Sequence, residues 1–90
     1  MSNSRPGGYE GGKGYHMKFV TYVAITFQDA KSIQMKFVTG TSGTTALWEQ
    51  GKPAIPFSEV IAKDIVYGLV LNGYRAIIVK VPAGREIINP

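Results

Sequence analysis

The longest apolar segment of this chain constrains its fold more than any other feature. It runs from Pro56 to Gly73 and is followed directly by a second apolar stretch, Tyr74–Val81. The first segment suits either a helix or one arm of a β-hairpin that turns at Asn72 and Gly73. The choice between them decides between an α+β fold and a small all-β barrel.

Several residues favour the helix. Ser58 can cap its first turn by accepting a hydrogen bond from a free backbone N–H, and Glu59 would lie at the positive end of the helix dipole. Gly73 can adopt the left-handed conformation that ends many helices. Apolar residues also recur at spacings of three and four along one face, namely Ile61, Ala62, Ile65 and Leu69.

The alternative is a hairpin of Asp64–Leu71 and Tyr74–Val81, because Asn-Gly is a frequent type I′ turn. The β-branched residues of the first arm suit a strand. However, Ser58–Leu71 is longer than most strands, and the adjacent charges of Lys63 and Asp64 would interrupt a buried one. We therefore predict a helix over residues 58–71.

Two strands precede this helix. Met17–Gln28 alternates, with Phe19, Val23 and Ile25 among the residues of one face, so that face is predicted to be core. The opposite face is also apolar and needs cover, for which the N-terminal tail and a second subunit are the candidates. Ser32–Thr39 alternates again, which predicts an antiparallel hairpin with one buried side, formed by Ile33, Met35 and Phe37.

After the helix, Ala76–Val79 is a continuous apolar run. Such a run is typical of a strand buried on both faces, so we predict a central position in the sheet, next to the first strand. The predicted fold is one α+β domain, residues 17–90, in ββαβ order. Residues 1–16, rich in glycine, are predicted to form a flexible arm.

Composition limits what else the chain can be. Its 90 residues form one small domain, and they include no cysteine, which excludes disulfides and thiolate metal sites. A core of this size is marginal, and the helix is apolar nearly all round, so a homo-oligomer is expected. The start of the chain lacks an apolar signal region and no apolar run is long enough to span a membrane. A cytoplasmic protein is expected.

The sequence contains no recognisable catalytic arrangement. His16 is the single histidine, and the acidic residues are dispersed, whereas a nucleophile needs a positioned base. We predict that the protein is not an enzyme and holds no metal or cofactor. Asp64 borders the apolar face of the helix, and we expect an ion pair with Arg75 or Lys80.

The formal net charge of +4 permits binding to nucleic acid. A flexible arm with aromatic and basic residues could stack on bases and contact phosphates, and a sheet face could form a stacking platform. We predict binding to single-stranded DNA or RNA, although scattered charges also suit a plain solubilising surface. The candidate residues are Arg5, Tyr9, Lys13 and Tyr15 of the arm, Lys18, Tyr22 and Lys36 on one outward face, and Trp48.

Two alternatives remain open. One is a homo-oligomeric structural or inhibitory protein, of the kind that phages and mobile elements encode, acting through apolar surfaces. The other is a binder of small anions at the hydroxyl-rich loop Gly40–Thr45, which lacks the Gly-Lys-Ser/Thr of a P-loop. The positions of Tyr22 and Trp48 discriminate between the first two hypotheses, since exposure favours nucleic acid and burial favours assembly.

Overall fold

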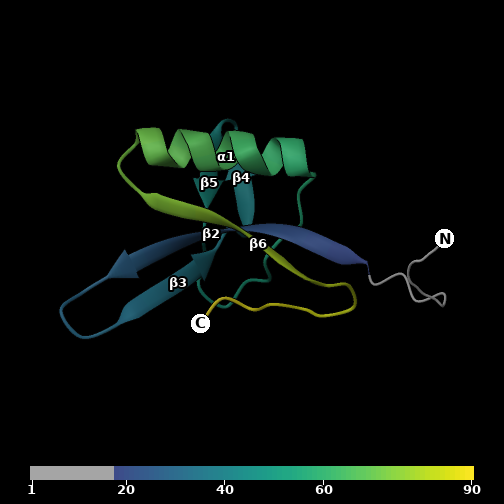
Figure 1. Cartoon of the computed structure of the whole chain (residues 1–90), viewed down its shortest axis with the longest axis horizontal. Coiled ribbons are helices and arrows are strands. Elements are labelled where there is room, and N and C mark those ends of the chain that lie inside the picture. The colour runs from purple at the N-terminus through teal and green to yellow at the C-terminus, as the bar shows by residue number, and fades with distance from the viewer. Residues whose placement is uncertain (1–17) are drawn as a thin grey trace, which may run out of the picture.

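The computed structural model describes residues 18–90, so the predicted arm lies outside the described residues. The described part is one α+β domain (Figure 1). Its sheets are not closed into a barrel, so that alternative is wrong. The elements, in chain order, are β2 (Phe19–Gln28), β3 (Ile33–Phe37), β4 (Gly40–Ser42), β5 (Thr45–Leu47), α1 (Glu59–Leu71) and β6 (Arg75–Pro82).

Helix α1 confirms the prediction for the central segment, including both of its ends. The Ile61 N–H donates to Ser58 Oγ over 3.3 Å, which makes Ser58 the N-cap. At the other end Gly73 has a φ of 89°. The Gly73 N–H donates to the Val70 carbonyl and the Tyr74 N–H to the Leu69 carbonyl, the two bonds of a Schellman motif. Asn72 and Gly73 therefore stop a helix and do not turn a hairpin.

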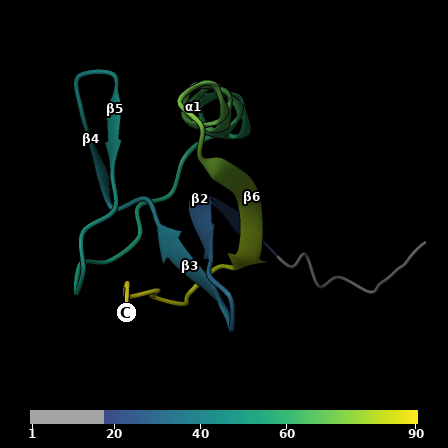
Figure 2. The same ribbon diagram turned by 90° about the vertical axis from the view of Figure 1, so that its left-hand side faces the viewer.

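The main sheet has three antiparallel strands in the order β3-β2-β6. The predicted neighbour of β6 is confirmed, because Phe19–Thr26 of β2 pairs with Arg75–Pro82. Its predicted central position is wrong, because β6 is an edge strand. The chain after β6 does not add a strand beside it. Instead it passes beneath the sheet on the side opposite α1 (Figures 1 and 2).

The β2–β3 hairpin is confirmed, but its register differs from the expected one. Ala24 lies opposite Phe37 and Ile25 lies opposite Lys36, and residues directly opposite share a face of the sheet. Phe37 therefore lies on the face of Ala24, away from α1, and not with core residue Ile25. Ile33, predicted to be buried, is 69% exposed.

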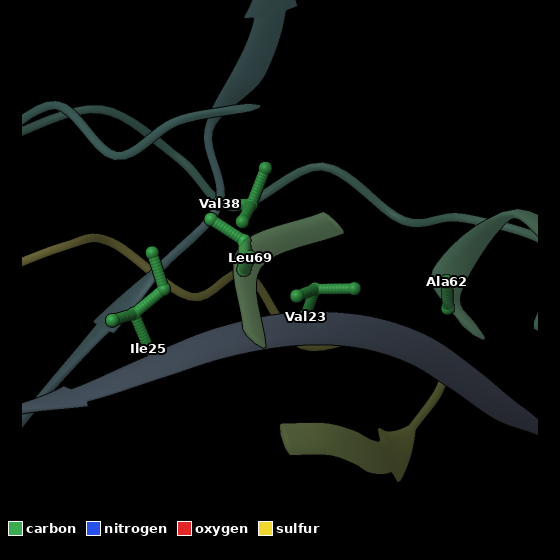
Figure 3. Packing of buried hydrophobic residues seen from close by; sticks show 5 residues of the cluster. All are labelled: Val23, Ile25, Val38, Ala62 and Leu69. Atoms are coloured by element: carbon green, nitrogen blue, oxygen red, sulfur yellow. The ribbon is translucent and has the colours of Figure 1, made fainter. Parts of the chain in front are cut away.

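The hydrophobic core lies between α1 and the upper face of the sheet. Helix α1 packs on β2 and β6, and Val38, the residue after β3, completes the buried cluster. Figure 3 shows its five buried members, Val23, Ile25, Val38, Ala62 and Leu69. On the lower face of β2, Tyr22 and Ala24 are also buried, and the chain after β6 passes beneath this face (Figure 1).

Residues Gly40–Thr45, predicted to be a loop, mostly belong to a second hairpin. Strands β4 and β5 pair antiparallel, with Thr41 opposite Ala46. Gly43 has a φ of 61° at the turn, a left-handed conformation that glycine adopts without strain. The hairpin stands away from the main sheet, beside α1 (Figure 2).

Candidate functional site

The predicted nucleic-acid face is not assembled on the sheet. Tyr22 is 6% exposed, and its ring meets Phe37 edge to face, with centroids 6.2 Å apart. Lys36 lies on the opposite face, across from Ile25, and its Nζ donates to the Pro90 carbonyl. The prediction that Lys18, Tyr22 and Lys36 share one outward face is therefore wrong, and of the three Lys18 alone is exposed.

Trp48 is half-buried in an aromatic group of its own chain. Its ring centroid lies 5.2 Å from that of Tyr74, at an interplanar angle of 71°, and 6.4 Å from that of Phe27. It is therefore neither a free platform nor a fully buried core residue. The other four candidates, Arg5, Tyr9, Lys13 and Tyr15, lie outside the described residues.

Helix α1 has two open flanks, and one of them borders a groove. The groove lies between α1 and the β4–β5 hairpin and encloses about 930 Å³. Figure 2 shows that the β4–β5 hairpin stands beside α1. Its apolar and aromatic lining is Trp48, Phe57, Ile61, Ile65, Leu69 and Tyr74.

The polar groups of the groove are few. Thr41, Thr44 and Thr45 contribute hydroxyl groups from the hairpin, Asn72 contributes an amide, and Asp64 is the one charged residue in the lining. The expected ion pair of Asp64 with Arg75 or Lys80 is not formed. Lys80 Nζ instead lies 3.2 Å from Glu59 Oε2, the one salt bridge within residues 18–90. Asp64 thus presents an uncompensated carboxylate to an apolar groove.

The other flank of α1 lies over the free edge of β6. In an antiparallel pair, alternate residues direct their backbone N–H and C=O groups to the partner and away from it. The Ala83 N–H donates to the Lys18 carbonyl, so the backbone groups of the odd-numbered residues of β6 face β2. It follows that the backbone groups of Ala76, Ile78 and Lys80 face outward, and no described segment pairs with them.

This edge lacks the usual protection. Exposed edge strands are commonly blunted by lysines, prolines or bulges. In β6, Lys80 is engaged by Glu59, and Pro82 comes only at the end of the strand. Between them the apolar run remains open, with Ile77 42% exposed on the lower face and Val70 of α1 exposed above.

At the opposite edge of the sheet, the chain itself covers the end of β3 at Phe37. Asn89 is buried, and its side chain bonds both backbone groups of Phe37. The Phe37 N–H donates to Asn89 Oδ1 over 2.7 Å, and Asn89 Nδ2 donates to the Phe37 carbonyl over 2.9 Å. Beside it, the Ile55 and Phe57 N–H groups donate to the Val38 and Thr21 carbonyls.

Within residues 18–90 no group of three or more histidine, aspartate or glutamate side chains is placed to hold a metal ion. Over the same range no helix has the length and apolar character to cross a bilayer. Comparisons with protein-family models, with curated proteins and with solved structures give no match to this chain.

Two features of this site were not predicted from the sequence. The groove depends on the hairpin at residues 40–47, where the sequence pattern predicts mostly loop, although its threonines are typical of strands. The free edge falls on the run Ala76–Val79, which was recognised as strand and wrongly assigned to the centre of the sheet. An apolar pattern shows that a strand is to be covered, but not what covers it.

Proposed function

We propose that this protein is a non-enzymatic assembly module that forms a homodimer through the free edge of β6 and the adjoining flank of α1. The observation that carries the proposal is the conflict between the sequence of β6 and its position. Its middle residues have the composition of a central strand, yet the strand lies at an edge. Pairing with a second copy would remove the conflict.

The edge is self-complementary. If a two-fold axis passed beside Ile78, the outward backbone groups of Ile78 would pair with their own copies, and those of Ala76 would pair with Lys80 of the other chain. Pro82 has no N–H and would lie just beyond the paired region. A six-stranded antiparallel sheet would result, with its unprotected edges joined at the centre.

The helices support the same arrangement. Strands in a sheet lie about 4.8 Å apart, and α1 packs on both β2 and β6. Two copies of α1 would therefore run antiparallel at about 10 Å, close to the usual packing distance. Glu59 of α1 contacts Lys80 of β6, and Lys63, Val66 and Val70 follow it on the same flank at helical spacing, so Val70 would become buried between the two helices.

The test is the molar mass of the full chain, measured by analytical ultracentrifugation between 1 and 100 µM (on the order of ordinary dimer affinities). We expect a dimer that Ile77→Lys converts to a monomer, because a lysine on an edge strand opposes pairing with a second strand. The matched control is Ile33→Lys, the same change at an exposed isoleucine of β3, which should remain dimeric. A monomeric wild type, or dissociation by the control alone, would overturn the proposal.

Binding to single-stranded nucleic acid stays a prediction. Its support is the net charge and the composition of residues 1–16, because the sheet platform is absent. Anisotropy titration of labelled oligo-dT and oligo-U at several salt concentrations tests it, since phosphate contacts weaken steeply with salt. Binding that is retained in Ile77→Lys would separate this activity from assembly.

A further inference from the structure

The groove between α1 and the β4–β5 hairpin lies on the flank of α1 that the proposed dimer leaves open. The geometry points to a second binding site there, and we propose that it takes an extended peptide segment of a partner protein in which an arginine or lysine stands between apolar residues. This inference does not rest on the proposed dimer, because the two sites occupy opposite flanks of the helix.

The size and lining of the groove fit such a segment. About 930 Å³ lies at the upper end of the range for sites of compact ligands and accommodates a few residues. Ile61, Ile65 and Phe57 supply apolar contact surface. Trp48 and Tyr74, packed edge to face, offer aromatic surface, and aromatic residues dominate the energetics of many peptide and protein interfaces.

Charge identifies the central residue of the ligand. The protein carries a net charge of +4, but the lining of the groove is negative. Asp64 is its one charged lining residue and forms no ion pair within residues 18–90. A guanidinium or ammonium group would pair with this carboxylate, and the nearby aromatic rings would add cation–π attraction.

The same observations count against an anion. The hypothesis of a small anionic ligand rested on the glycines and threonines of residues 40–45. Three of those threonines do line the groove, but they face a carboxylate there, which would repel phosphate. The hydroxyl groups are better placed to accept from, or donate to, the backbone of a bound peptide.

Trp48 provides the readout, because it is the single tryptophan of the chain and lines the groove. Its fluorescence would be titrated with three blocked tripeptides, acetyl-Leu-Arg-Leu-amide and its counterparts with glutamate or norleucine at the centre, and with inorganic phosphate. We expect the arginine peptide to bind about fivefold more tightly than the glutamate peptide, the scale of an exposed charge pair, and phosphate to have no effect.

Asp64→Asn should reduce the preference for arginine over glutamate to less than about twofold while leaving the norleucine peptide unaffected. Glu59→Gln removes an acid from the same helix outside the groove and should leave the preference unchanged. Equal binding of the three peptides, a response to phosphate, or a preference that survives Asp64→Asn would each overturn the proposal. Ile77→Lys should bind the arginine peptide as the wild type does, so failure of the dimer would not affect this result.

Discussion

The two edges of the main sheet are treated in opposite ways. At β3 the chain returns and covers the end of the strand, where the Asn89 amide bonds both backbone groups of Phe37 and Ile55 bonds the Val38 carbonyl. At β6 the edge is long, apolar and open among the described residues. The covered end of β3 contributes hydrogen bonds to the fold, whereas the open edge of β6 is the one that we propose to mediate association.

Proline substitutions in β6 give the largest expected effect, because they distinguish its two kinds of backbone N–H. By the alternation described above, the Ile77 N–H bonds to Ala24, which is fully buried. Ile77→Pro should therefore destabilise the fold by about 3 kcal/mol, through a lost ladder bond and a buried carbonyl without a partner. Urea unfolding followed by circular dichroism measures it.

The matched variant is Ala76→Pro, whose N–H faces outward. We expect it to change the free energy of unfolding by less than about 1 kcal/mol and to abolish dimerisation in the ultracentrifuge. If the two prolines were equally destabilising, the assignment of outward and inward groups would be wrong.

Opening the closed edge should come next in size. Asn89→Ala removes the partners of both Phe37 backbone groups and a 3.2 Å bond to the Glu49 carbonyl. The expected loss is about 2 to 3 kcal/mol, because the groups left behind are partly buried. Thermal unfolding should show a Tm lower by roughly 10 to 20 °C for a domain of this size.

The control for this variant is Asn72→Ala, which removes an exposed amide bonded to the Gly68 carbonyl over 2.8 Å. It should cost at most about 1 kcal/mol. Asn89→Ala should also expose the β3 edge and increase self-association with rising concentration. A Tm as high as that of Asn72→Ala would show that Asn89 does not close the edge.

A smaller effect is expected at the ion pair that engages Lys80. Glu59→Gln breaks the 3.2 Å contact, but both side chains are about half-exposed, so the loss should not exceed about 0.5 kcal/mol. Because Lys80 would then be a free charge at the β6 edge, we expect the dimer to weaken slightly, and high salt to remove the difference. Sedimentation at two salt concentrations measures this, and a tighter dimer would contradict it.

The smallest effect concerns the turn that leads into β3. Backbone hydrogen bonds from Lys31 and then Ser32 hold the pKa of Asp29 below its usual value of 3.8, since they favour the charged form. A carboxyl group whose pKa is lower in the folded state than in the unfolded state stabilises the fold at pH values above its unfolded pKa. This stabilisation is lost as the pH falls through the folded pKa. Asp29→Asn should therefore flatten the decline in Tm below about pH 4, and an unchanged decline would exclude this origin.

Local chemistry was enough to predict some elements. Ser58 and Gly73 mark the ends of α1 because capping depends on bonds within a few residues. The alternation in residues 17–28 indicated a strand with two apolar faces, and the second of these proved to be covered by the C-terminal segment. The α+β class followed once the central segment was recognised as a helix.

Features that depend on pairing could not be predicted in this way. A turn of Asp29–Ser32 sets which residue of β3 lies opposite Ile25, and a change of one position exchanges the faces. For this reason Tyr22 and Lys36, which have the same parity in the sequence, lie on opposite sides of the sheet. Trp48 likewise belongs to a groove whose other wall comes from α1.

The sequence by itself determined where the helix begins and ends and which strands must be covered, because these follow from capping and from hydrophobic periodicity. The tertiary structure alone decided that β6 lies at an edge, that Asn89 closes the other edge and that Asp64 faces a groove. Each of these depends on contacts between residues far apart in the chain, and local sequence patterns do not predict the free energies of such contacts.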